Sequence, residues 1–171
     1  MVMHKTHNVI ARKQSGSSMI EVLVSLLVLG IGILGINALQ ASSMRSNQSA
    51  YLRTQAVFNS FDIVERIHSN KTGAEAGNYN DPTPSINANC VAAAGCSASA
   101  MAAHDVAEWE ANVAATMPMG AAVVCLDSSP DDGTAASPAC DNLGDYYAVK
   151  IWWDDNRDGT ANMQYVMTFE P

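Results

Sequence analysis

The chain has 171 residues, of which 48% are hydrophobic, and its formal net charge at pH 7 is -8. This length accommodates one folded domain and one additional segment. The acidic balance excludes a general nucleic-acid binder, because phosphate binding depends on Lys and Arg. We therefore expect no nucleic-acid partner.

An uncharged apolar stretch dominates the first third of the chain. Three basic residues precede it, Glu21 stands at its head, and residues 22–44 carry no formal charge. At about 1.5 Å per residue, the apolar part covers roughly the 30 Å of a hydrocarbon core. Basic residues are scarce after the stretch, which predicts a cytoplasmic amino end. We predict a membrane segment over residues 20–39.

Two ordinary membrane segments could also explain this stretch. A secretory signal peptide suits the basic leader. It is opposed by the carboxylate of Glu21, by the lack of a good small-x-small cleavage site, and by a helix-friendly sequence that continues to His68. A plain single-span anchor explains the apolar residues but leaves Gly16 and Glu21 unexplained.

The sequence Gly-Ser-Ser-Met-Ile-Glu-Val-Leu-Val, which begins at Gly16, resembles the class III signal of type IV prepilins and type II secretion pseudopilins. The resemblance implies that prepilin peptidase cuts between Gly16 and Ser17, and that the new amine of Ser17 is N-methylated. Ser17 departs from the phenylalanine that most members have. The family also implies that Glu21 assists filament assembly by pairing with the amine of a neighbouring subunit, whereas pairing within one subunit stays open.

The chain divides into three predicted segments. Residues 1–16 form a cleaved leader, residues 17–70 form one long helix, and residues 71–171 form a disulfide-bonded globular head. The second half of the helix carries an apolar stripe on which a domain should pack; its members are Leu52, Ala56, Val57, Phe61, Ile63, Val64 and Ile67. Charged residues, Arg66 among them, take the other side.

The head combines helical and strand patterns. Residues 99–116 predict a second helix, whose acidic residues Asp105, Glu108 and Glu110 are spaced as a solvated surface. Three runs rich in β-branched and aromatic residues predict strands, the last two of which form an antiparallel hairpin; they span residues 121–126, 146–153 and 163–169. The expected fold is α+β. The pilin resemblance implies the same: a long helix, transmembrane in its first half, packed on a small antiparallel sheet.

All four cysteines lie beyond the membrane segment, which implies disulfides in an exported head with three alternative pairings. We favour Cys90 with Cys96 and Cys125 with Cys140, because each pair closes one polar loop. Zinc is the alternative, but no CxxC spacing occurs.

Asp154, Asn156 and Asp158, followed by Gly159, repeat the first half of a calcium loop. Position twelve of that loop would be Tyr165 instead of glutamate. A polar hairpin turn is the favoured interpretation, and a weak calcium site stays open; we expect no other cofactor. No nucleophile–base pair, phosphate loop or HExxH motif occurs, so we expect no enzyme.

Several segments are similar to the PilV family of minor pilins, the type IV pilus modification proteins. They are Ile20–Val24, Gly30–Gly35, Glu65–Asn70 and, more thinly, Asp105–Trp109 with Cys90 and Cys96. The resemblance implies a subunit that joins other minor pilins and the major pilin, primes pilus assembly, and supports adhesion or twitching, with a possible adhesin at the tip.

That resemblance also implies a location. The chain would cross the inner membrane once, with its head in the periplasm, and then enter a pilus on the surface of a Gram-negative bacterium. The alternatives are a minor pseudopilin of a type II secretion system and a membrane-anchored periplasmic binding module.

Overall fold

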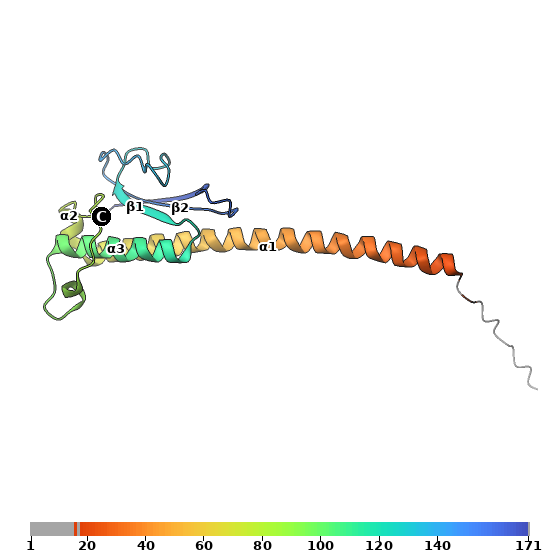
Figure 1. The fold of residues 1–171 in the computed structure, drawn as a ribbon. Coiled ribbons are helices and arrows are strands. Elements are labelled where there is room, and N and C mark those ends of the chain that lie inside the picture. Colours follow the sequence, from red (N-terminus) through yellow and green to blue (C-terminus); the bar gives the residue numbers. More distant parts are fainter. Residues whose placement is uncertain (1–15, 17, 171) are drawn as a thin grey trace, which may run out of the picture. The chain divides into compact units, whose positions relative to one another are not determined.

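A computed structural model describes residue 16 and residues 18–170 of the chain, which forms two compact units, Met1–Arg45 and Ser46–Pro171. Its elements, in chain order, are α1 (Met19–Ser69), α2 (Lys71–Glu75), the 3-10 turn η1 (Ala88–Val91), α3 (Ala98–Thr116), β1 (Ala121–Leu126), β2 (Tyr147–Trp153) and β3 (Met163–Phe169) (Figure 1). The α+β prediction is confirmed. Ser17 and the leader up to residue 15 lie outside the described residues.

The amino-terminal unit consists of the first part of α1. The helix starts where the carbonyl of Ser18 accepts hydrogen bonds from the amides of Glu21 and Val22, at 2.9 and 3.3 Å. An 18-residue window of α1 has a mean hydropathy of 2.6, and none of that window is buried by the rest of the chain. By length and composition, this helix can cross a membrane.

The head contains one antiparallel sheet of three strands in the order β1-β2-β3. Val149 of β2 lies opposite Val124 of β1 and Met167 of β3. The predicted hairpin of the last two strands is confirmed, and β2 begins one residue later than expected. All seven residues of β2 are buried, because both faces of the sheet are covered.

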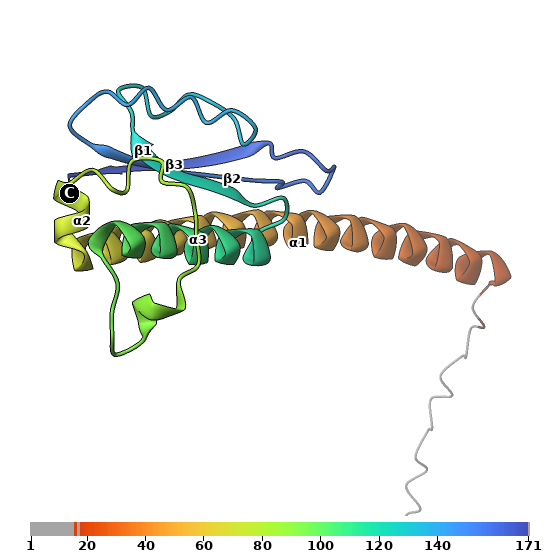
Figure 2. The ribbon, with the colours of Figure 1, turned by 60° about the vertical axis from the view of Figure 1, so that its left-hand side comes forward.

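One face of the sheet packs on helices. Within the head, the carboxyl-terminal part of α1 and α3 lie side by side on this face (Figure 2). Alternate residues of β2 point toward them, as the period of two in a strand requires. The largest side chains of this core that are fully buried are Trp109, Trp153, Tyr79, Tyr147, Ile63, Ile67 and Ile151.

The other face of the sheet is covered by the loop of residues 127–144. A smaller apolar cluster lies here, formed by Val123, Cys125 and Trp152, with Ala135, Cys140 and Ala161 packed against it. The loop thus gives the sheet its second buried face.

The predicted stripe of α1 is only partly covered. Phe61, which we expected to broaden it, is 52% exposed, whereas Asn59 and Ser60 are buried. Both polar side chains are satisfied: the hydroxyl of Ser60 donates to the carbonyl of Ala56 at 2.9 Å, and the amide oxygen of Asn59 accepts from Asn112 at 2.8 Å. These bonds let the buried face of α1 turn toward α3, away from Phe61.

Sequence reasoning also missed the short helix α2. Asn70 organises it, because its side-chain oxygen accepts from the amide of Gly73 at 3.3 Å. Its side-chain nitrogen donates to the carbonyl of Ala98 at 2.8 Å and to the hydroxyl of Tyr79 at 3.1 Å. Asn70 thus joins the end of α1 to the start of α3.

Candidate functional site

The amino-terminal site consists of Gly16, Ser17 and Glu21, of which Gly16 and Glu21 are described and exposed. Glu21 lies in the first turn of α1, where a negative charge is favoured by the helix dipole. Among residues 18–170, no cationic side chain lies within ion-pair distance of its carboxylate. The carboxylate is therefore available to a cation from outside this part of the chain.

Behind Glu21, α1 offers an uncharged surface with three glycines. An added Cβ at Gly30, Gly32 or Gly35 would meet no atom of the described chain within 4 Å. The chain's own packing therefore does not require glycine at these positions. Small residues at such spacing let a neighbouring helix approach closely, which is how helices associate in lipid.

Both cysteine pairs of the head are disulfides in the structure, and each joins cysteines that are near in sequence. Cys90 and Cys96, with Cα atoms 4.7 Å apart, connect η1 to the residue before the cap of α3. Cys125 and Cys140, with Cα atoms 6.2 Å apart, connect β1 to the loop of residues 127–144. Among the described residues, no cysteine is free.

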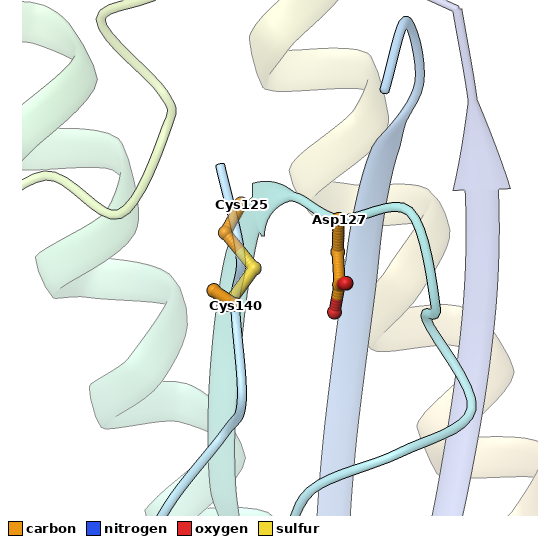
Figure 3. A group of neighbouring side chains, drawn as sticks. All are labelled: Cys125, Asp127 and Cys140. Atoms are coloured by element: carbon orange, nitrogen blue, oxygen red, sulfur yellow. A yellow bond between two sulfur atoms is a disulfide. The ribbon is translucent and has the colours of Figure 1, made fainter. Parts of the chain in front are cut away.

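Asp127 lies beside the second disulfide (Figure 3). Ligand atoms of Cys125, Asp127 and Cys140 lie within 4.8 Å of one another, a spacing that could suit a metal ion. Metal binding needs thiolates, however, and both sulfurs here are bonded to each other. The Asp127 carboxylate has a different partner.

That partner is Lys150, in the middle of β2. Its ammonium pairs with the Asp127 carboxylate, and both side chains are fully buried. It also donates to the carbonyl of Pro138 at 2.9 Å and to the carbonyl of Asp132 at 3.2 Å. Lys150 thus holds the loop of residues 127–144 onto the sheet from inside. A single Lys within an otherwise uncharged strand was the signal that sequence reasoning missed.

The carboxylate of Asp132 also contacts this ammonium, with Oδ1 at 3.2 Å from Nζ. Hydrogen bonds from the Ser129 hydroxyl and from Lys150 lower the pKa of Asp132. The loop therefore presents acceptors to Lys150 from three of its residues. Four oxygens thus surround an ammonium that has three protons to donate. A buried charge needs such hydrogen-bond partners.

A second polar centre joins α1 to α3. Nη1 of Arg66 lies 2.9 Å from the Glu108 carboxylate and 3.6 Å from that of Asp105, while Nε lies 3.2 Å from Asp62. The hydroxyl of Tyr79 donates to Asp105 at 2.6 Å. The network fixes the side-by-side arrangement of the two helices.

These contacts correct the expectation of a solvated acidic surface on α3. Asp105 is 7% exposed, and both Asp105 and Glu108 face Arg66. Burial by itself would lower the pKa of Arg66, but its hydrogen bond with Glu108 and the nearby carboxylates raise it overall. The same hydrogen bond lowers the pKa of Glu108, and burial raises that of Tyr79.

Asp154, Asn156 and Asp158 come together in the turn between β2 and β3. The two carboxylate oxygens of Asp154 accept from the amides of Asp158 at 3.3 Å and Gly159 at 2.7 Å. The side-chain amide of Asn156 donates to Asp158 at 3.0 Å. The oxygens that a calcium ion would use thus serve the turn itself, and a weak calcium site stays the untested alternative to a polar turn.

Two family models match the chain. Residues 11–37 match the prokaryotic N-terminal methylation motif, and residues 38–107 match the model described as Tt1218-like, type IV pilin Tt1218. The matches indicate a prepilin-type amino end and, behind it, a stretch similar to a type IV pilin. No curated protein and no solved structure matches significantly.

The two matches divide the site residues of the chain into groups. The methylation motif contains Gly16, Ser17 and Glu21, and the pilin model contains Arg66 and Asp105. The model ends within α3, so the sheet, the second disulfide and the pair of Lys150 with Asp127 lie beyond it. Pilins are structural subunits, and the prepilin motif together with the apolar helix indicates membrane anchoring.

Proposed function

We propose that the protein is a minor pilin of the PilV type, which joins other minor pilins and the major pilin in a complex that initiates a type IV pilus. The observation that carries this proposal is that a methylation motif, which includes most of an uncharged apolar stretch, is followed directly by a match to a type IV pilin model along the same helix. A signal peptide or a simple anchor accounts for the apolar helix alone.

In this proposal, residues 1–16 are a leader that prepilin peptidase removes after Gly16, and Ser17 is methylated. The mature chain begins with the helix, and residues 71–171 form the head. The positive amine of Ser17 and the carboxylate of Glu21 then lie one helical turn apart. Because a carboxylate in an apolar filament core needs a cationic partner, Glu21 of one subunit pairs with the amine of the next.

The proposed location follows from the charge pattern of the sequence. The helix crosses the inner membrane once and the head, with its disulfides, lies in the oxidising periplasm of a Gram-negative bacterium before entering the pilus. At the pilus tip, the head would contact other minor pilins and an adhesin, and so support adhesion or twitching. We assign the protein no catalytic role.

A minor pseudopilin of a type II secretion system is the second candidate, because such proteins begin with nearly the same signal as the one at Gly16. Deletion separates the two: loss of piliation supports the pilus subunit, and loss of secretion with intact pili supports the pseudopilin. A membrane-anchored binding module predicts neither phenotype.

The deciding experiment is intact-mass measurement and amino-terminal sequencing of the membrane-extracted protein, from cells with and without prepilin peptidase. We expect a chain that starts at methylated Ser17 only when the peptidase is present. An uncut chain, or one that starts after Ala41 or Ser43, would contradict the pilin proposal.

A further inference from the structure

The two edges of the head's sheet differ in whether the chain itself covers them. The outer edge of β1 is covered by the chain itself: the carbonyl of Val124 accepts from the amide of Asp81 at 3.0 Å, and the amide of Leu126 donates to the side chain of Asn80 at 2.9 Å. Along β3, no backbone group of residues 18–170 pairs with the outer edge. This edge can accept another strand.

The sequence of β3 lacks the usual protection of an edge strand. Soluble proteins place charges, prolines or bulges on exposed edges to prevent pairing with other chains. The seven residues Met163–Phe169 contain no charged residue and no proline, and they pair without interruption with β2. An unprotected edge of this length indicates a partner that covers it.

A hollow lies near each end of β3. One, of about 290 Å³, is lined by Arg53 and Val57 of α1, Trp153 of β2 and residues 163–165 of β3. The other, of about 270 Å³, is lined by Ile67, His68, Lys71, Ala74 and Glu170. β3 therefore runs alongside α1 in the same direction. The ring centroids of Phe169 and His68 lie 5.8 Å apart.

Between the two hollows, α1 provides an apolar floor. Val57, Phe61, Val64 and His68 follow one another at spacings of four, three and four, which places them on one stripe of the helix. Phe61 is the large residue of this stripe that the head leaves uncovered. A strand added to β3 would place every second side chain over this stripe.

The charges around the two hollows indicate which kind of segment could bind along β3. Elsewhere in the head, Lys150 is buried against Asp127, and Arg66 is surrounded by carboxylates. Arg53 stands at one hollow, and it forms no ion pair within residues 18–170. At the other hollow, Lys71 pairs with Glu75 at 3.6 Å and Glu170 adds a further carboxylate. In a chain of net charge -8, the groove therefore has one cationic end, at Arg53.

We propose that the edge of β3 and the 57–61–64–68 stripe of α1 form a docking groove for an extended segment of another protein, which adds a fourth strand to the sheet. The segment has apolar residues at alternate positions and an acidic residue at the end that meets Arg53. About seven residues suffice, since a strand advances roughly 3.4 Å per residue. Backbone hydrogen bonds to β3 supply affinity, and the two hollows supply selectivity.

A second copy of the chain fits this groove less well. Symmetric pairing of two β3 strands would be antiparallel. Because β3 follows α1 within the head, such pairing would make the head segments of α1 run in opposite directions, whereas subunits of one filament share a direction.

The test uses the full-length protein in phospholipid nanodiscs and three labelled peptides. The first alternates valine and threonine between terminal glutamates, the second has lysines at the ends, and the third has a central proline. We expect the glutamate peptide to bind at least tenfold more tightly than either of the others. On binding, amide hydrogen exchange within residues 163–169 should slow.

Variants locate the binding. Phe61→Glu, in the floor, and Thr168→Lys, at an exposed position of β3, should each weaken binding at least tenfold. Phe58→Glu is the matched control, because Phe58 is 63% exposed on the same helix but lies outside the stripe. Circular dichroism verifies that each variant is folded.

Three results would overturn the proposal: unchanged exchange in β3 with every peptide, equal loss of binding in the Phe58 variant, or concentration-dependent self-association that Thr168→Lys abolishes. The last would assign the groove to a second copy. None of these results depends on cleavage at Gly16, so the groove is tested apart from the pilin proposal. Only the argument against a second copy rests on that proposal.

Discussion

The ammonium of Lys150, on the central strand, pairs with the carboxylate of Asp127, at the start of the loop that covers that strand. Both side chains are fully buried, so each depends on the other for its charge. Removing one partner of a buried pair leaves the other charge buried without a counter-charge, which typically costs about 3 to 5 kcal/mol of stability. Replacing both with apolar residues of similar size costs far less.

We therefore expect Lys150→Met or Asp127→Asn to destabilise the head by about 3 to 5 kcal/mol, and the double variant Lys150→Met with Asp127→Leu to recover much of this loss. Urea unfolding with intact disulfides measures these changes. Asp131→Asn is the control, because Asp131 is exposed in the same loop. Additive losses in the double variant would contradict the coupling.

The network around Arg66 should make the head sensitive to acid. The hydrogen bond from Arg66 lowers the pKa of Glu108, so the ionised form of Glu108 is more favourable in the folded state than in the unfolded chain. This stabilisation is present above the unfolded pKa of about 4.3 and is lost as the pH falls through the lower, folded value.

Unfolding measured from pH 7 to pH 3 tests this sensitivity. Glu108→Gln should reduce stability at pH 7 and flatten its decline in acid, whereas Glu75→Gln, at an exposed pair with Lys71, should change little. An equal decline in acid for Glu108→Gln and the natural chain would show that Glu108 does not contribute.

Glu110 should have the opposite effect. Burial and the nearby charge of Asp81 raise its pKa, so its ionised form is less favourable in the folded state. The resulting destabilisation is absent below the unfolded pKa, grows as the pH rises from that value to the folded pKa, and is complete above the folded pKa. We expect Glu110→Gln to raise the melting temperature at pH 7 and to have no such effect at pH 3. A lower melting temperature at pH 7 would contradict this assignment.

The hydrophobic periodicity of the sequence predicted the elements but not the polar contacts between them. Apolar runs of distinct period defined α1, α3 and the three strands to within one or two residues. The burial of Asp105 depends on Arg66 and Tyr79, which are distant in sequence, so the local pattern on α3 suggested solvent. For the same reason, the pattern on α1 did not predict that Asn59 is buried and Phe61 exposed. Asn59 can be buried because Asn112, which is distant in sequence, donates a hydrogen bond to it.

The two disulfides should contribute unequally. Cys125 and Cys140 are 15 residues apart, and Cys90 and Cys96 are 6 apart. Closing a 15-residue loop stabilises by about 3 kcal/mol in the chain-entropy account, and a shorter loop gives less. We expect Cys125→Ser with Cys140→Ser to destabilise the head more than Cys90→Ser with Cys96→Ser, because the former also frees the loop that Lys150 holds. Equal midpoints in urea would contradict this order.

Glu21 provides the sharpest test of filament assembly. Its carboxylate stands at the head of the uncharged stretch of residues 22–44, without a cationic side chain nearby among the described residues. A charge carried to the middle of an apolar layer costs about 2.5 to 3.5 kcal/mol, so its presence there requires a partner. If that partner is the amine of a neighbouring subunit, Glu21→Gln should leave membrane insertion and cleavage after Gly16 intact. The amount of the protein in sheared pili should fall at least tenfold. Glu65→Gln, at an exposed position of the same helix, is the control, and normal incorporation of the Glu21 variant would exclude an assembly role for this carboxylate.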